Sequence, residues 1–485
     1  MMKKLLLLEI NEIPWRIIDK FKSDPKLPNI KRFFENSKNY TTVVDLSNEM
    51  SYEAELVKGI SKEGRPVVID SGELSPWVTW PTFHRGITSQ EHGIKFLGQD
   101  ITTFKGKPIW QEFLDFGLNI GICGSLQSWP PLDPSPGGFY IPDTFAHNEK
   151  CFPRYIEPFQ KFNLSQVQKN GLVIRQKELF TSEVTPLIFS FSRLGVKFNT
   201  LLKVVNQLFG ELIDKSKLAC RPIFQCVLFW DIFKHLYNIK SPPALATFFT
   251  NHVASIMHRY WHHIFPDDFG VIYKDLESSH EETMFFALKV VDNILFDAMN
   301  FCNKNPEIVL VFATSMGQDA IHYDSYDGYS AELEDVTKLF EIFGIKQNDY
   351  TPFLAMVPQV SIEVKDVEIR KRIIDCLSKC FLNSGKLLFS SCEKGNSLSI
   401  TIHNPSREDV ALGTFIYKGD NKQFMNIGWE VSGITIHKLD VATAYHTREG
   451  IMAVYGKGII PNNSRHEILL SKCKSYLMNL AFQDR

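Results

Sequence analysis

A hydroxyl residue in an aromatic, turn-rich segment is the first candidate for chemistry in this chain of 485 residues. Thr79 lies within residues 75–94, SPWVTWPTFHRGITSQEHGI, which end in His-Gly-Ile. A threonine hydroxyl is a weak nucleophile until a base or a metal ion removes its proton. The segment therefore needs ligands from elsewhere, and partial candidates stand at Glu9, His258 and His446. Without such ligands its tryptophans and phenylalanine would simply be a packed aromatic loop.

Short apolar runs that alternate with helical patterns must position these residues. The runs at residues 5–8, 119–124 and 308–314 are typical of strands inside a parallel sheet. Strands separated by helices predict an α/β fold whose sheet is covered on both faces, with its site at the carboxyl ends of the strands. Glu9, like Thr79 and Ser315, is expected at or just past such an end, which favours one shared site.

Composition excludes several classes of protein. A net charge of −2, from 53 basic and 55 acidic residues, argues against a nucleic-acid partner. Nine scattered cysteines fit reduced thiols and predict a cytoplasmic location. The amino-terminal apolar run stops at Glu9, too early for a signal peptide. Nothing in the chain approaches the roughly 20 apolar residues of a membrane span, so no span is expected.

Two segments are predicted to interrupt the core. Residues 148–241 are rich in Phe, Leu, Lys and Gln, with amphipathic stretches such as 198–209, and we interpret them as a mainly helical cap. Residues 351–405 combine strand and helix patterns and predict a small α+β module. The core is then expected to comprise residues 1–147, 242–350 and 406–485.

The segment around Thr79 resembles the nucleophile region of the alkaline phosphatase superfamily, in particular of type I phosphodiesterases and nucleotide pyrophosphatases. In that family a threonine before an aromatic-Pro pair attacks phosphorus, and here Thr79 precedes Trp80-Pro81. Trp129-Pro130-Pro131, followed by Gly-Gly-Phe, resembles a motif of some bacterial members. The resemblance runs from residue 5 to about 460 outside the two insertions. It implies an alkaline-phosphatase-like three-layer sandwich around a central, mostly parallel sheet.

The same resemblance implies a divalent metal, zinc by family precedent. Glu9 stands where the family has a metal-binding aspartate. His446 precedes Gly450 and the apolar run IMAVYGKG, similar to the family's histidine, glycine and strand. For the middle ligands, Asp231 and His235 have the family's Asp-x-x-x-His spacing.

His258 offers the better surroundings for that middle position, in MHRYWHHIFPD, although Ala254 stands where the family has aspartate. We favour His258, with Asn251 and His252 as polar substitutes that contact substrate. Asp231 and His235 stay open as the alternative pair.

Residues 313–318, ATSMGQ, depart most from the family pattern. The family has Ser-Asp-His-Gly there, and Ser315 and Met316 replace the aspartate and histidine. A neutral hydroxyl and a thioether are poor zinc ligands, so the usual two-metal clamp cannot be assembled. Gln318 is expected to contact substrate instead.

Two function classes follow. The first is a metal-assisted phosphoryl-transfer enzyme, a phosphodiesterase or phosphotransferase that uses Thr79 on a small-molecule or glycan-linked phosphate ester. The second is an altered or inactive relative that binds a sugar or anionic ligand in the same crevice. A sulfatase is disfavoured, since sulfatases modify a Cys or Ser at the nucleophile position. Hydrolysis versus transfer and the oligomeric state stay open.

Overall fold

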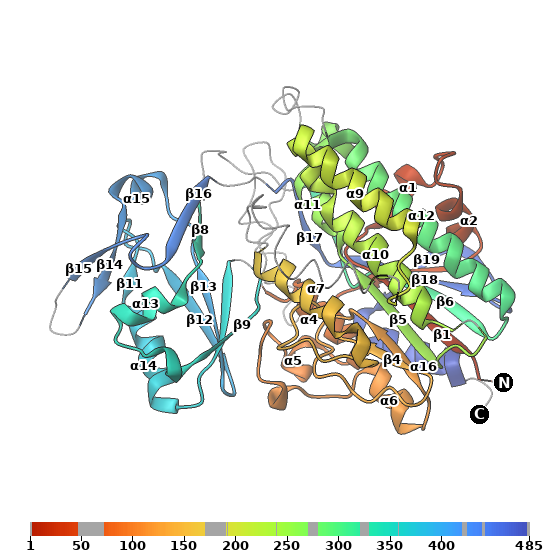
Figure 1. The fold of residues 1–485 in the computed structure, drawn as a ribbon, viewed down its shortest axis with the longest axis horizontal. Coiled ribbons are helices and arrows are strands. Elements are labelled where there is room, and N and C mark those ends of the chain that lie inside the picture. The colour runs from red at the N-terminus through yellow and green to blue at the C-terminus, as the bar shows by residue number, and fades with distance from the viewer. Residues whose placement is uncertain are drawn as a thin grey trace.

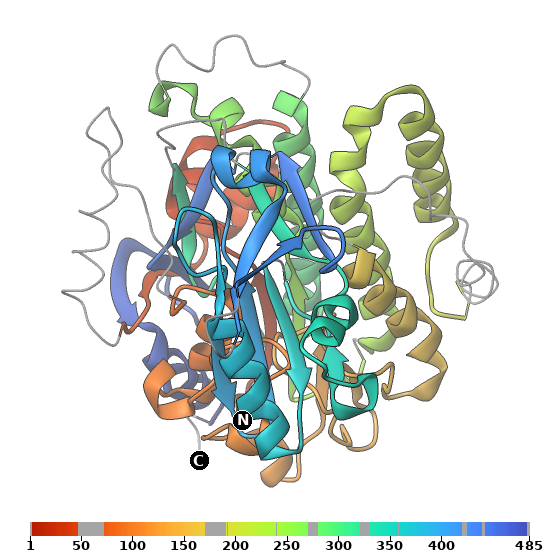
Figure 2. The same cartoon turned by 90° about the vertical axis from the view of Figure 1, so that its left-hand side faces the viewer.

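The computed structural model describes most of the chain. The described ranges are residues 2–46, 72–169, 191, 193–238, 240–269, 280–320, 329–356, 358–419, 424–438 and 442–482. Figure 1 shows a large and a small lobe side by side, and Figure 2 shows the same fold from the side of the small lobe.

An eight-stranded sheet in the order β19-β2-β18-β6-β1-β5-β3-β4 forms the centre of the large lobe. Only β18 runs antiparallel to its neighbours. The strands are β1 (Lys4–Ile10), β2 (Lys38–Val43), β3 (Ile120–Cys123), β4 (Phe139–Ile141), β5 (Leu245–Thr250), β6 (Ile308–Ala313), β18 (Glu449–Gly456) and β19 (Asn462–Leu469). The prediction of an α/β fold with a central, mostly parallel sheet is confirmed.

Strand β1 explains why the sheet is covered on both faces. Leu6 and Leu8 belong to one hydrophobic cluster, whereas Leu5 and Leu7 belong to another. Successive side chains of a strand point to opposite faces, so an uninterrupted apolar run has to be buried on both sides. The first cluster includes α1 (Trp15–Phe21), α2 (Pro28–Glu35), α10 (Arg221–Leu236), α11 (His252–Ile264) and α12 (Glu281–Lys304). The second includes α4 (Pro76–Arg85), α6 (Ile109–Asp115) and α16 (Cys473–Phe482). These helices make the outer layers (Figure 1).

The predicted cap, residues 148–241, is mainly helical where it is described. It contains α7 (Glu157–Lys169), α9 (Phe198–Ile213) and α10. Buried side chains of α7 and α10 join the first cluster of the large lobe, and α9 packs against it through the partly buried Leu201 and Val204. Residues 170–190, 192 and 239 of this segment lie outside the described residues.

The small lobe has its own hydrophobic core, formed by residues between Ala331 and Ile434. This core extends beyond the α+β module expected at residues 351–405. A four-stranded sheet, β12-β13-β10-β9, packs beside α14 (Val367–Ser378). The other elements of this lobe are β8 (Tyr329–Leu333), α13 (Val336–Ile342), β9 (Thr351–Phe353), β10 (Gln359–Glu363), β11 (Cys380–Phe381), β12 (Phe389–Lys394), β13 (Ser397–Ile402), α15 (Arg407–Leu412), β14 (Thr414–Lys418), β15 (Phe424–Gly428) and β16 (Ile434–Lys438).

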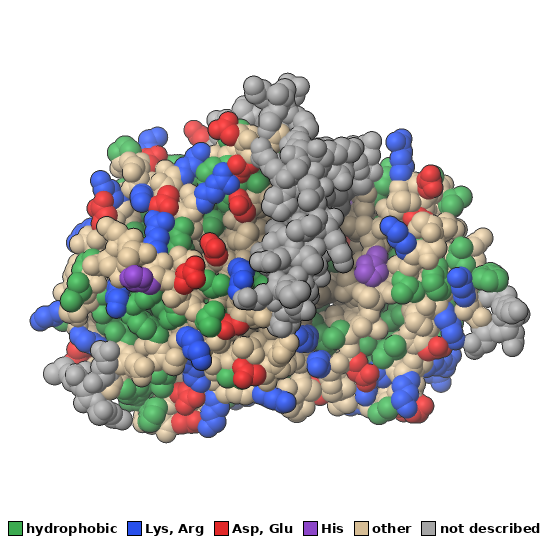
Figure 3. Space-filling view, turned by 180° about the vertical axis from the view of Figure 1, so that it is seen from behind, with side chains coloured by type: hydrophobic (Ala, Val, Ile, Leu, Met, Phe, Trp, Pro, Cys, Tyr) green, Lys and Arg blue, Asp and Glu red, His purple; other side chains and the backbone are tan. Residues whose placement is uncertain are grey.

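Specific contacts join the two lobes. The rings of His147 and Phe353 stack with their centroids 3.9 Å apart. The backbone N–H of Asn396 donates to Asp100 Oδ2 at 3.1 Å. On the rear face, basic and acidic side chains are interspersed rather than gathered into one patch (Figure 3). Among the described helices, none is both long and apolar enough to cross a membrane.

Candidate functional site

Three possible ligand groups from distant parts of the chain converge at one point. The ligand atoms of Glu12, His258 and His446 all lie within 4.8 Å of one another. Glu12 Oε2 is 3.1 Å from His258 Nε2 and 3.5 Å from His446 Nε2. Two ligand atoms that each lie about 2.0–2.1 Å from a tetrahedral zinc ion are about 3.4 Å apart. The spacing of these three groups therefore fits one divalent ion.

The carboxyl edge of the central sheet brings these groups together. Glu12 lies two residues beyond β1 in a left-handed conformation, φ 63°, which is uncommon for a residue with a side chain. His258 lies on α11, the helix that follows β5. His446 lies on β17 (Ala444–Thr447), opposite Gln318 on β7 (Gly317–Ala320). Sites at such an edge are typical of open α/β sheets.

The hydrogen bonds of His258 constrain what can lie between it and Glu12. Its Nδ1 is 2.8 Å from the carbonyl oxygen of Ala444, which can only accept, so Nδ1 must carry a proton. A neutral imidazole has a single N–H, and Nε2 then directs a lone pair at the carboxylate of Glu12. This contact is repulsive unless the ring is an imidazolium or a cation lies between the two groups. A backbone carbonyl on the other ring nitrogen is the usual support of a metal-binding histidine.

The carboxylate of Glu12 is held in its ionised form. Asn11 Nδ2 donates to Oε1 at 2.6 Å, and Gln318 Nε2 donates to Oε2. Burial acts to raise the pKa of this carboxyl, but when the two rings are imidazolium the charge of His446 and the hydrogen bonds from His258 and His446 outweigh burial. They hold that pKa well below its ordinary value. An ionised, buried carboxylate beside two imidazoles is a suitable donor set for a divalent cation.

Thr79 lies on α4. Its side chain is fully buried, and Oγ1 is 2.8 Å from Ser315 Oγ. Oγ1 also donates to the carbonyl oxygen of Ser75 at 3.3 Å. The following residue, Trp80, donates from Nε1 to Asn11 Oδ1 at 2.8 Å, and Asn11 in turn holds Glu12. The predicted nucleophile is thus tied to the ligand group through its neighbour.

Glu9, the carboxylate predicted as a metal ligand, lies elsewhere. Strand β1 continues to Ile10, so Glu9 is inside the strand and shares the face of Leu7. Its Oε1 is 2.7 Å from His84 Nε2, and both side chains are buried. Glu9 Oε2 has no hydrogen-bond partner among the described residues. The structure thus brings together two of the predicted ligands, His258 and His446, and places Glu12 with them.

Of the three predicted substrate contacts, two lie at the site and one does not. Asn251 Oδ1 accepts from Asn11 Nδ2 at 2.6 Å, and Gln318 binds Glu12, so both belong to the network of the site. His252 is buried and donates from Nε2 to the carbonyl oxygen of Ala287 at 3.2 Å. Burial lowers the pKa of this imidazole to about 4, which keeps it neutral. It therefore contributes to packing beneath the site.

The alternative middle pair, Asp231 and His235, lies on α10. Asp231 Oδ2 accepts a hydrogen bond from Thr200 Oγ1 at 2.6 Å and anchors α9. His235 packs against the tight turn at Gly195. Neither belongs to the group of ligand atoms around Glu12. Met316, in the other departure from the family pattern, is buried in the second hydrophobic cluster.

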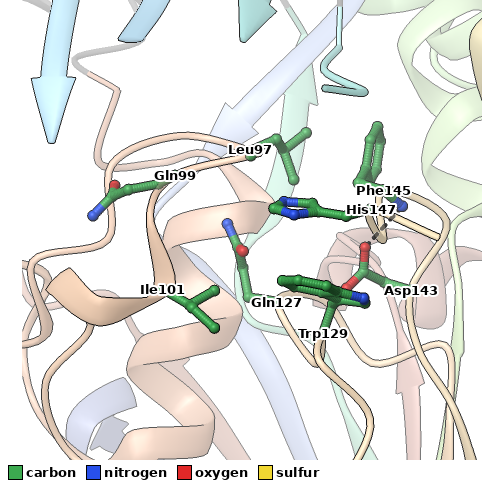
Figure 4. Close-up of a pocket in the computed structure, with 9 residues that line it drawn as sticks. Leu97, Gln99, Ile101, Gln127, Trp129, Asp143, Phe145 and His147 are labelled. Atoms are coloured by element: carbon green, nitrogen blue, oxygen red, sulfur yellow. Dashed lines mark hydrogen bonds between the residues drawn. The ribbon is translucent and has the colours of Figure 1, made fainter. Parts of the chain in front are cut away.

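A pocket beside the junction of the lobes is lined in part by Trp129 of the Trp-Pro-Pro motif. The ring of His147 stacks between those of Trp129 and Phe353, at centroid distances of 4.0 and 3.9 Å. Burial raises the pKa of Asp143 to about 6 and lowers that of His147 to about 4. Figure 4 shows His147 above Trp129. Asp143 lies beside them, and its Oδ1 accepts from the backbone N–H of Phe145 at 2.8 Å. The pocket is lined by Leu97, Gly98, Gln99, Ile101, Gln127, Trp129, Asp143, Phe145 and His147.

No protein-family model and no curated protein sequence matches this chain. Solved structures give weak likenesses at 10% identity that cover 99% of this chain and 95% of the other. They are murine ectonucleotide pyrophosphatase/phosphodiesterase 5, with a TM-score of 0.39, and the human protein of that name, with 0.40. An inactive variant of the murine protein in complex with AMP gives 0.38.

Proposed function

We propose that this chain is a metal-assisted phosphoryl-transfer enzyme, a phosphodiesterase or phosphotransferase of the alkaline phosphatase type. The contact between His258 Nε2 and Glu12 Oε2 carries the proposal, because a neutral ring and a carboxylate at 3.1 Å repel each other unless a cation lies between them. Glu12, His258 and His446 would hold a divalent ion, zinc by its preference for imidazole and carboxylate. A bound ion would lower the pKa of a hydroxyl and stabilise charge on phosphate oxygens.

Thr79 supplies the nucleophile in this proposal. A bond forms between Thr79 Oγ1 and phosphorus while the bond from phosphorus to the leaving oxygen breaks, and the hydroxyl proton leaves with the alcohol product. Water or a second alcohol then cleaves the phospho-threonine and restores the hydroxyl. Ser315, at 2.8 Å, orients Oγ1, while Asn11 and Gln318 fix the carboxylate of Glu12. The substrate class is a small-molecule or glycan-linked phosphate ester, and the predicted cytoplasmic location is part of the proposal.

A second candidate function is binding of a sugar or anionic ligand without turnover. It is favoured by the full burial of Thr79, since attack on a substrate requires the hydroxyl to become accessible. Ser315 and Met316 also offer no second pair of metal ligands. The three ligand groups around Glu12 favour the enzyme.

The experiment compares wild type with Thr79→Ala, Thr79→Ser and His446→Ala on phosphodiesters and nucleotide sugars. Loss of the nucleophile should lower kcat/KM by roughly three orders of magnitude or more, and Thr79→Ser should retain part of the activity. Thr82→Ala, one turn further along α4 and equally buried, controls for disturbance of the helix. Equal activity in wild type, Thr79→Ala and His446→Ala would show that this site does not carry the reaction. No activity in any of them while a glycan still binds would instead establish the binding protein.

A further inference from the structure

Helix α9 presents apolar side chains to solvent. Figure 2 shows this yellow-green helix at the outer edge of the large lobe. Six of its apolar side chains are between 44% and 89% exposed: Phe198, Leu202, Val205, Phe209, Leu212 and Ile213. Their spacing of three, four and seven residues places them on one side of a helix. A continuous exposed apolar stripe of this kind marks an interaction surface.

The opposite side of α9 faces the large lobe, where Leu201 and Val204 pack on the first hydrophobic cluster beside two buried polar residues. Its two buried residues are Thr200 and Glu211. Thr200 Oγ1 donates to Asp231 at 2.6 Å, and Glu211 pairs with Arg221 at 2.8 Å. These buried bonds fix the rotation of the helix, so the apolar stripe is held outward by specific contacts.

Exposed basic residues outnumber acidic ones in α9 and the segments next to it. The exposed charged residues between 193 and 217 are Arg193, Lys197, Lys203, Lys215 and Lys217 against the single acid Asp214, in a chain whose net charge is −2. Lys215 and Lys217 lie two and four residues after Ile213, which with Leu212 is the most exposed apolar residue of α9. The charge of this surface is therefore complementary to an anionic partner.

We infer that α9 docks on a bilayer that contains anionic phospholipids, with its apolar stripe among the acyl chains and its basic rim at the headgroups. An amphipathic helix lying in the interface buries apolar surface, and each nearby cation adds attraction to anionic lipid. A symmetric dimer through the same face would bring two basic rims together, which disfavours a second copy as the occupant. The inference concerns a surface outside the proposed active site and does not depend on the proposed reaction.

Vesicle co-sedimentation of the full chain tests the inference, with phosphatidylcholine vesicles prepared with and without phosphatidylserine. Wild type should sediment with the anionic vesicles and be released by high salt. Leu212→Ser with Ile213→Ser should weaken this binding at least tenfold, from the apolar area lost. Ile460→Ser, which removes an isolated side chain that is 81% exposed, is the matched control and should bind like wild type.

Lys203→Glu with Lys215→Glu should also weaken binding to anionic vesicles while leaving the apolar stripe intact. Phe198→Ser with Leu202→Ser, at the other end of α9, provides a second apolar test if the first double variant does not fold. Three results would overturn the inference. They are no sedimentation of wild type with anionic vesicles, equal weakening by the α9 and Ile460 substitutions, or a stable wild-type dimer that the α9 substitutions dissociate in light scattering.

Discussion

His258 Nε2 lies 3.1 Å from Glu12 Oε2, while Nδ1 of the same ring donates to the carbonyl oxygen of Ala444. The one proton of a neutral ring is therefore already used, and the lone pair of Nε2 meets a carboxylate that is ionised. His446 Nε2 approaches the same oxygen at 3.5 Å. A shared divalent ion satisfies all three groups with one set of contacts, whereas two charged imidazoles would have to be buried around one carboxylate.

Gln318 is predicted to support the ligand group through Glu12. Its amide donates to Glu12 Oε2 and, at 3.2 Å, to the carbonyl oxygen of Ala254. Gln318→Leu removes this orientation without removing a ligand, and loss of such a supporting group weakens metal binding by about 10–100-fold. Competition titration with a chelator measures the affinity. An unchanged dissociation constant would show that Gln318 does not orient Glu12.

The buried pair of Glu9 and His84 is predicted to be structural. His84→Leu would leave the carboxylate of Glu9 in the interior without a partner, since both side chains are at most 1% exposed. Breaking a buried pair in this way costs about 3–5 kcal/mol, measured by urea unfolding of the protein. The double variant Glu9→Leu with His84→Leu should recover part of the loss. A single variant as stable as wild type would contradict this role.

His92 is predicted to make the fold less stable in mild acid. Its Nδ1 accepts from the backbone N–H of Ile94 at 3.0 Å, so Nε2 carries the proton and donates to Thr82 Oγ1. Burial lowers the pKa of His92 from 6.5 to about 4. Between these values the unfolded chain binds a proton that the folded chain does not, so this stability is present above pH 6.5 and is lost as the pH falls towards 4.

A titration-free variant measures that contribution. His92→Asn keeps an acceptor near Nδ1 but has no titrating ring. The difference in unfolding free energy between pH 7 and pH 5 should be smaller in this variant than in wild type by about 2 kcal/mol. Identical pH profiles for the two proteins would show that His92 titrates normally.

The sequence predicts the architecture better than the site. The apolar run at residues 5–8 indicates a strand buried on both faces, and β1 is such a strand. A strand in the middle of a covered parallel sheet needs apolar side chains on both faces, so its sequence is an uninterrupted apolar run. The same run suggests that the strand stops at Glu9. Pairing with β5 instead extends it to Ile10. Glu9 therefore points towards the second cluster, and Glu12 lies at the sheet edge.

Long-range neighbours account for the rest. His258 and His446 are indicated by their local surroundings, but no local pattern shows that they meet Glu12, which lies 246 and 434 residues away. Residues 198–209 are visibly amphipathic. Their apolar side faces outward because Asp231 and Arg221 bind the polar side of α9. Such partners are specified by the fold and not by helical spacing.

Metal content tests the central claim most directly. Wild type, Glu12→Gln and Glu9→Gln would be purified without chelator, saturated with zinc, dialysed and measured by elemental analysis. Glu12 contacts both imidazoles, whereas Glu9 contacts His84. We predict one tightly held ion per chain in wild type and in Glu9→Gln, and its loss in Glu12→Gln. No retained metal in wild type, or metal lost from Glu9→Gln but kept by Glu12→Gln, would contradict the site described here.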